Sequence, residues 1–397
     1  MVFNQSLCNS NWSTRPADER FWDCSEAAAV ATAQRDASQE SLAASANLRA
    51  VEFDGAPALM GSANVPATFS NYGFGQLCSR IKAPAEYLRS LSAGMATQLI
   101  EYGLRRLPKQ DLNLYMSVDR SAETPALMIR SATSERYERI FNAQVLGFAK
   151  RLEDDGWRAP PGWLPGCEIG AALEARGRTR KAVAADVAVS ARVQLGDTIG
   201  PAGVYLSDRD CFIFLVHPDR DVTVGAGEQT QHLMRGVIIS NSEVGDGALW
   251  LRTMLFEGAC GNHNLLGVKE VNEFSIRHIG EAQERLGRAQ IAFRRYLDSG
   301  TGQLIEQIER AKNFQLGATK EQALDELLAL AARKKIQATK GQLADALGVA
   351  ERTPRYGDPL SIWAVAQGLT EISQALPHAS ARTTLDRAAG RLAAVAF

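Results

Sequence analysis

The spacing of apolar residues divides the chain into stretches of different secondary structure. Between residues 72 and 104 the spacing is helical, because Phe74, Leu77, Cys78 and Ile81 recur at i, i+3, i+4 and i+7. Residues 137–154 are also predicted to be a helix, which ends at an Asp-Gly pair.

The centre of the chain consists of short apolar runs separated by turn residues. Residues 112–118 and 126–130 are two such runs with a short link, as in a hairpin or an adjacent pair of strands. The turn signals lie too close together for crossover helices, so a mainly antiparallel sheet is expected. The further predicted strands are residues 185–195, 204–205, 211–216, 234–240 and 248–256.

From residue 272 onward the pattern is helical to the end. Residues 274–311 are predicted to form one long helix, or one that is broken at residues 299–302, where glycines gather. The other helices are expected at residues 319–332, 339–347, 360–376 and 379–396.

These patterns predict an α+β fold in three parts. Residues 1–60, rich in Ala, Ser and acidic residues, are expected to form a partly ordered N-terminal arm. Residues 61–271 are expected to form an α+β core in which helices pack on a mainly antiparallel central sheet, and residues 272–397 a helical C-terminal region. We find no internal repeat at a period of 20–50 residues.

The charge is balanced overall and uneven along the chain. Lys and Arg total 44 against 45 Asp and Glu, which excludes a histone-like polycation. Residues 1–60 and 200–259 each carry eight acidic and four basic residues, whereas residues 130–151 carry five basic and two acidic residues. This asymmetry is compatible with a basic groove on an otherwise neutral protein.

The cysteines and the N-terminus indicate a compartment. Six scattered cysteines contain no CxxC pair, which argues against a disulfide framework or a zinc finger. The first residues lack the basic and apolar regions of a secretory signal, and no apolar run approaches the 18 residues of a membrane span. We therefore expect a cytoplasmic protein that does not enter a membrane.

Two clusters of basic residues are candidate nucleic-acid contacts. One places four positive charges within residues 176–181, and the other surrounds the start of the helix predicted at residue 137. Cations beside hydroxyl groups and helix N-terminal amides suit phosphate contacts, and an adjacent tyrosine is a candidate for stacking on a base. The alternative is a solvated charged face. The candidate binding residues are Arg130, Arg136, Tyr137, Arg139, Arg176, Arg178, Arg180 and Lys181.

A polar segment at residues 241–246 admits two interpretations. In the functional interpretation, Glu243 and Asp246 are metal ligands or Glu243 is a general base, and a metal-dependent nuclease would use Glu243 with Asp208 or Asp210. In the structural interpretation, the segment is a hairpin whose polar side chains bond the turn backbone. We favour the structural interpretation, and we favour an inert thiol over a Cys260–His263 catalytic dyad. The sequence contains no Walker loop, dinucleotide fingerprint, HExxH motif or GxSxG elbow, so we assign no catalytic residue, metal site or cofactor.

Several motifs resemble a family of phage- and plasmid-borne proteins of unknown function, usually described as phage/plasmid-like proteins. The most specific are the run SNSEVG at residues 240–245 and the corner CGN at residues 260–262; the similarity extends from about residue 14 to the C-terminal helices. The resemblance implies a mobile genetic element, often near recombination and single-strand-binding genes. It brings no catalytic residues.

We therefore expect a DNA-handling protein that binds single-stranded DNA as a homo-oligomer, with strand annealing as a further candidate activity. One alternative is a non-enzymatic interaction, anti-defence or structural protein of a mobile element. A weaker alternative is a metal-dependent nuclease that uses Glu243.

Overall fold

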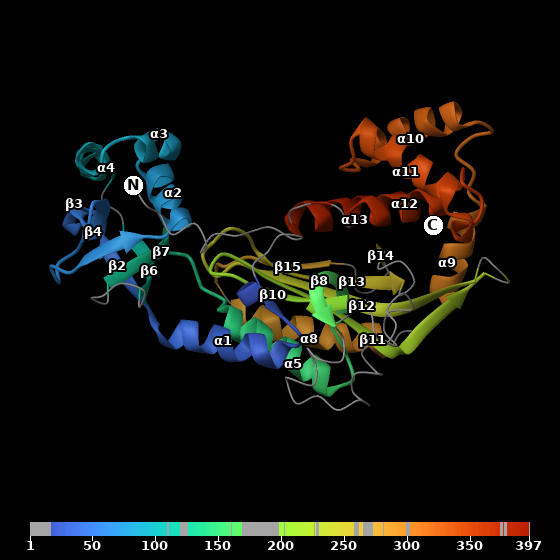
Figure 1. Ribbon diagram of the computed structural model, residues 1–397, viewed down its shortest axis with the longest axis horizontal. Coiled ribbons are helices and arrows are strands. Elements are labelled where there is room, and N and C mark those ends of the chain that lie inside the picture. The colour runs from blue at the N-terminus through green and yellow to red at the C-terminus, as the bar shows by residue number, and fades with distance from the viewer. Residues whose placement is uncertain are drawn as a thin grey trace.

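The protein is an α+β structure with two large sheets and a helical C-terminal region (Figure 1). The computed structural model describes residues 17–108, 111–119, 126–159, 161–168, 198–201, 203–225, 227, 230–257, 262–264, 273–280, 282–298, 302–373, 376 and 379–396.

The first sheet has six strands and lies at one end of the molecule (Figure 1). Its strand order is β2-β6-β7-β5-β4-β3, and every pair is antiparallel except β5 with β7. Three helices pack on this sheet around a core that contains Phe74, Leu77 and Ile129. The strands are β2 (Ser38–Ala44), β3 (Arg49–Phe53), β4 (Ala56–Met60), β5 (Pro66–Phe69), β6 (Asp111–Asp119) and β7 (Ala126–Ser134), and the helices are α2 (Asn71–Arg80), α3 (Ala85–Ser90) and α4 (Ala93–Arg106).

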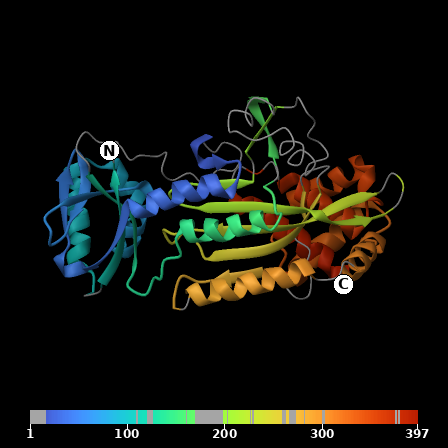
Figure 2. The same cartoon turned by 90° about the horizontal axis from the view of Figure 1, so that it is seen from below.

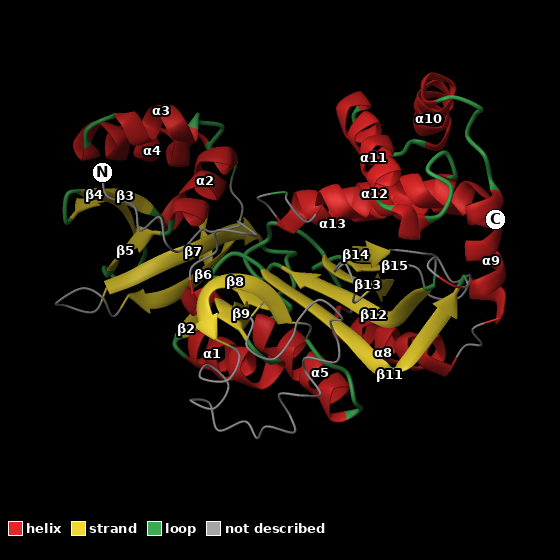
Figure 3. Cartoon of the chain, turned by 45° about the vertical axis from the view of Figure 1, so that its right-hand side comes forward, coloured by secondary structure: helices red, strands yellow, loops and turns green. Residues whose placement is uncertain are grey.

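The second sheet has seven strands, and all its pairs are antiparallel. The order is β1-β10-β11-β12-β13-β14, and β15 also pairs with β13. The strands are β1 (Arg20–Phe21), β10 (Val204–Leu206), β11 (Cys211–Val224), β12 (Gln231–Asn241), β13 (Leu249–Glu257), β14 (Asn262–Asn264) and β15 (Glu273–Ile276). A separate two-stranded sheet pairs β8 (Pro161–Glu168) with β9 (Thr198–Pro201) (Figure 3).

Successive residues of the long strands point to opposite faces of the seven-stranded sheet. Ile213 and Leu215 pack against α1 (Cys24–Asp36), α5 (Asn142–Asp154) and α8 (Ala282–Asp298), which lie along one face (Figure 2). Phe212 and Phe214 belong to a second apolar cluster on the other face. Both faces of the seven-stranded sheet are therefore apolar. The helices α1, α5 and α8 cover one face, and the C-terminal helices lie on the side of the face that carries Phe212 (Figure 1).

The C-terminal helices pack at the far end of the seven-stranded sheet (Figure 1). The ends of β11 and β12 contribute Val222 and Leu233 to their core. At Gly368 an added Cβ would lie 2.4 Å from the carbonyl oxygen of Ala346, so only glycine permits this close crossing of two helices. The helices are α9 (Gly302–Asn313), α10 (Lys320–Lys334), α11 (Lys340–Arg352), α12 (Ile362–Ser373) and α13 (Ala379–Ala393).

The predicted fold class is confirmed: antiparallel pairing dominates, helices pack on the sheets, and the C-terminal region is helical. The expectation of one central sheet was wrong, because the predicted strands divide between two sheets. The helix predicted from residue 137 begins only at Asn142, and residues 273–276 form a strand where a helix start was expected. Residues 20–60, expected in an N-terminal arm, contribute strands to both large sheets and the helix α1. Residues 185–195 lie outside the described part of the chain.

Candidate nucleic-acid interface

The turn between β12 and β13 joins the two large sheets. We call residues 242–247 the junction turn. Its backbone accepts hydrogen bonds from the Gln76 side chain at the Val244 oxygen (2.8 Å) and from the Tyr137 hydroxyl at the Ser242 oxygen (3.1 Å). Gly245 has a φ of 89°, a conformation that glycine adopts without strain. Polar groups of this turn therefore hold α2 and the segment before α5 against the seven-stranded sheet.

Glu243 forms a buried ion pair at the centre of the junction turn. Its Oε1 lies 3.0 Å from Nη1 of Arg130 in β7, and both side chains are 3% exposed. The backbone N–H of Asn142 donates to the second carboxylate oxygen at 2.9 Å. Burial alone would lower the pKa of Arg130, but Glu243, Tyr115 and Asp208 together raise it above its usual value. Arg130 thus stays charged, and this pair has a structural function.

Arg139 and Tyr137 belong to the same buried cluster. The Arg139 guanidinium donates to the Glu243 carbonyl oxygen and lies 4.2 Å from the centre of the Tyr115 ring. Tyr137 stacks on His278, with ring centres 5.0 Å apart and planes 5° from parallel. Burial lowers the pKa of His278 to about 4, so the imidazole is neutral near pH 7.

The residues predicted to bind nucleic acid are not gathered on one exposed surface among the described residues. Arg130 and Arg139 are 3% and 5% exposed, so their guanidinium groups face protein partners rather than a strand at the surface. Tyr137 already has a stacking partner, and Arg136 is exposed in the segment before α5. The other predicted contacts, Arg176, Arg178, Arg180 and Lys181, lie outside the described residues.

The residues considered for a metal site do not converge on one point. Glu243 faces Arg130, and Asp210 accepts a hydrogen bond from Ser207 at 3.0 Å. Burial raises the pKa of Asp208 to about 7. Within the described ranges, no group of three or more His, Cys, Asp or Glu side chains could hold a metal ion. Cys260 is outside those ranges.

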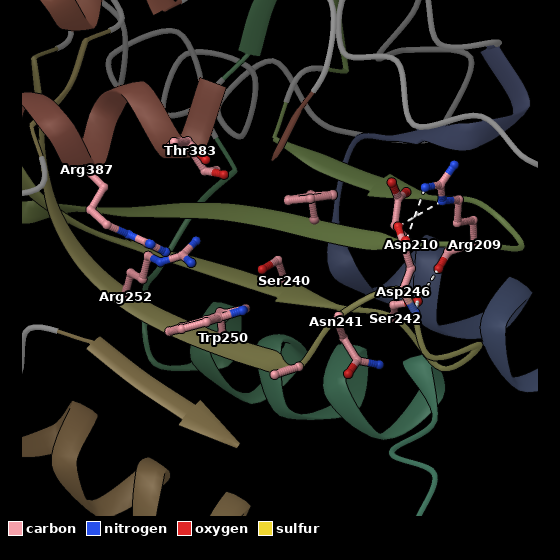
Figure 4. A pocket seen from close by; sticks show the side chains of 14 residues that line it. Arg209, Asp210, Ser240, Asn241, Ser242, Asp246, Trp250, Arg252, Thr383 and Arg387 are labelled. Atoms are coloured by element: carbon pink, nitrogen blue, oxygen red, sulfur yellow. Dashed lines mark hydrogen bonds and ion pairs between the residues drawn. The ribbon is translucent and has the colours of Figure 1, made fainter. Parts of the chain in front are cut away.

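A cavity of about 270 Å³ lies between the seven-stranded sheet and α13; we call it the α13 cavity. Its floor comes from β11, β12 and β13, and its wall from Thr383, Thr384 and Arg387 of α13. Arg252 and Arg387 reach toward each other above Trp250, from β13 and α13 respectively (Figure 4). Their Cζ atoms lie 4.7 and 5.2 Å from the centre of the Trp250 ring.

Two further cavities adjoin the α13 cavity along the junction between the sheets. Arg209 lines both the α13 cavity and a cavity of about 420 Å³ against α2. Gln76 and Ser79 line that second cavity and a third of about 560 Å³, beside Arg80 and Lys82. The three cavities therefore follow one another in a row from α13 past the junction turn to the end of α2, and each shares lining residues with the next. We call this row of cavities the basic groove.

Positive charge dominates the lining of the basic groove. Two carboxylates, Asp210 and Asp246, line the described parts of the three cavities, and Asp246 forms an ion pair with Arg209 at 2.8 Å. Tyr72 lies beneath that arginine, with the Arg209 Cζ 5.0 Å from its ring centre. The cationic lining residues are Arg80, Lys82, Arg89, Arg209, Arg252 and Arg387.

Sequence reasoning missed these six residues because none lies in a run of like charge. Only folding brings Arg387 beside Arg252, across 134 intervening residues. One local signal was present: Arg252 interrupts the apolar strand β13 two positions after Trp250, and residues at i and i+2 share a face of a strand.

The fold and the groove define an α+β protein with a basic depression between two sheets. The sequence model of a family described as a domain of unknown function (DUF932) matches residues 187–395, just over half of the chain, so the protein belongs to this family. No curated protein and no solved structure matches the chain. In the part of the chain that the structure describes, no helix has the length and apolar character needed to span a bilayer.

Proposed function

We propose that the protein binds single-stranded nucleic acid, with single-stranded DNA as the expected substrate, along the basic groove. The observation that supports this most directly is the lining of the three adjoining cavities by six cationic side chains and two carboxylates. Phosphate groups supply most of the affinity of non-specific nucleic-acid binding, and they bind where Lys and Arg concentrate.

Aromatic side chains in the groove favour a single strand over a duplex. Tyr72 and Trp250 line the groove, each beside arginine. Sites for single strands combine a basic groove with aromatic rings and arginine planes against which unpaired bases stack. The bases of a duplex are stacked on one another inside the helix, so they do not stack on aromatic side chains of a protein groove.

The wider setting of this activity rests on the sequence. The similarity to phage- and plasmid-borne proteins supports a function in a mobile genetic element, in the cytoplasm, where recombination uses single strands. Annealing by a homo-oligomer follows from the same setting, since annealing proteins align two strands on neighbouring subunits. Arg209, Arg252 and Arg387 lie inside the stretch matched by the family, whereas Arg80 and Lys82 lie outside it.

The salt dependence of binding to a single-stranded oligonucleotide tests the proposal. For single strands the logarithm of affinity falls by about 0.7 per phosphate contact for each tenfold rise in salt. Six contacts would weaken binding about 300-fold between 50 and 200 mM salt. The variant Arg80→Gln/Lys82→Gln should reduce the slope by about 1.4, because two contacts are lost.

The matched control removes two charges from the opposite side of the sheet. Arg285 and Arg288 are exposed on α8, which packs on the face away from the groove. The variant Arg285→Gln/Arg288→Gln should therefore keep the wild-type slope. Equal slopes for both double variants, or no binding of any oligonucleotide at about 50 mM salt, would contradict the proposal.

A further inference from the structure

The α13 cavity differs from the rest of the groove in the arrangement of its charges. Arg252 comes from the middle of β13 and is 5% exposed, so the strand and its neighbours hold its position. Arg387 approaches from α13, and both guanidinium groups lie close to the same ring of Trp250 (Figure 4). Two like charges thus meet at one end of the cavity, whereas the carboxylates of Asp210 and Asp246 lie at the other end beside Arg209 (Figure 4).

The surrounding groups are suited to an oxyanion. Thr383 and Thr384 add hydroxyl groups to the wall formed by Arg387, and Ser240 adds another from the floor. Hydroxyl and guanidinium groups are the usual side-chain donors to phosphate oxygens. The Trp250 ring lies within 4.7 and 5.2 Å of the two Cζ atoms, so one aromatic side chain holds both guanidinium groups at the same place in the cavity.

The two positive charges at the Arg252 and Arg387 end of this cavity match a phosphate monoester better than an internal phosphodiester. A monoester has a second pKa near 6 and carries about −1.5 to −2 at pH 7, whereas each backbone phosphodiester carries a single negative charge. The cavity volume of about 270 Å³ is enough for a small group, such as one phosphate with its sugar. In addition, among the described residues the α13 cavity is the last in the row of three cavities that begins at the end of α2.

We propose that the α13 cavity binds the phosphate monoester of a nucleotide unit, through Arg252 and Arg387, and that it is the end site of the basic groove. This proposal rests on the proposed function in placing that unit at the end of a bound strand. A free nucleoside monophosphate carries the same chemical group, so the experiment must separate the two sources.

The test compares three twelve-residue thymidine oligonucleotides, which carry a 5′ phosphate, a 3′ phosphate or two hydroxyl ends. Fluorescence anisotropy should show about tenfold tighter binding of one phosphorylated form than of the form with two hydroxyl ends. Arg387→Gln should abolish this preference, so that all three oligonucleotides bind with equal affinity, and Arg387→Lys should retain part of the preference.

A control on the same helix is available. Arg391 is exposed, lies one turn beyond Arg387, and donates to the Lys335 carbonyl oxygen instead of lining the cavity. Arg391→Gln should therefore keep the full preference for the phosphorylated end. Circular dichroism and thermal unfolding of each variant establish that it is folded before its affinity is compared.

A second measurement separates this inference from the proposed function. If dTMP raises the melting temperature of the protein while thymidine does not, and Arg387→Gln removes the rise, the cavity binds a phosphate monoester even if no oligonucleotide binds. Oligonucleotide binding without any preference for a phosphorylated end, together with equal effects of dTMP and thymidine, overturns the inference and leaves the proposed function standing.

Discussion

The ion pair between Glu243 and Arg130 makes a strong prediction about stability. Glu243→Gln preserves the shape of the side chain and an acceptor for the Asn142 N–H, but it removes the negative charge opposite a guanidinium that is 3% exposed. Removing one partner of a buried ion pair costs about 3–5 kcal/mol, because the remaining charge is buried without compensation. The variant should lose this amount of unfolding free energy, a large share of the total for a typical domain.

Urea denaturation followed by tryptophan fluorescence measures this loss. The control is Glu284→Gln on α8, where both members of the Glu284–Arg288 pair are more than half exposed and removal should cost less than about 1 kcal/mol. The double variant Arg130→Met/Glu243→Gln should be more stable than Glu243→Gln, because it removes the unpaired charge. A loss for Glu243→Gln no larger than for the control would refute the structural function given to the junction turn.

Two further predictions concern packing and pH. Gly368→Ala should lower the melting temperature, at a cost of about 1–3 kcal/mol, because its Cβ would lie 2.4 Å from the Ala346 oxygen. Gly287→Ala on α8 should raise the melting temperature slightly, because no atom lies within 4 Å of the added Cβ. A higher melting temperature by calorimetry for Gly368→Ala than for Gly287→Ala would contradict the close packing at Gly368. Burial raises the pKa of the Glu153 carboxyl to about 7 from its usual 4.5, so the folded protein binds a proton at Glu153 more tightly than the unfolded chain does. The free energy of unfolding should therefore fall by up to about 3 kcal/mol as the pH rises from 4.5 to 7. Denaturation curves of Glu153→Gln should show a smaller fall over that interval, and an unchanged pH profile would contradict the assignment.

Local patterns predicted the elements whose signals lie within a few neighbouring residues. The runs at 112–118 and 126–130 do pair, as β6 with β7. Thr319 and Thr339 cap α10 and α11 at the predicted starts, since their hydroxyl groups accept hydrogen bonds from backbone N–H groups three residues later. The break predicted at residues 299–302 separates α8 from α9.

The elements that the sequence did not predict depend on contacts between residues far apart in the chain. Strand β2 reads SQESLAA, with polar and small residues on both faces, because among the described strands it is an edge strand that pairs with β6, 67 to 79 residues later. The helix predicted at residue 137 starts late because Tyr137 and Arg139 bond to the junction turn, whose partners are about 100 residues away.

For the candidate site too, the sequence predicted features of neighbouring residues but not contacts between residues far apart in the chain. Dense charge is visible in sequence, and it led to Arg130 and Arg139, which the fold buries. The cations of the basic groove come from α2 and the residues just after it, from α3, from the loop between β10 and β11, and from β13 and α13, so only the tertiary structure assembles them. The interpretation of residues 241–246 as a hairpin with bonded polar groups fits the structure, in which Ser242 bonds Arg209 O and Asp246 N.

Photocrosslinking tests the central claim, that the basic groove binds a single strand, most directly. A single-stranded DNA oligonucleotide that carries 4-thiothymidine would be irradiated with the protein at about 50 mM salt, and the attached peptides would be located by mass spectrometry. We expect attachment within residues 71–89 and 246–252, which contain Tyr72 and Trp250, and loss of that attachment at high salt. Attachment confined to α8, or attachment that high salt leaves unchanged, would contradict it.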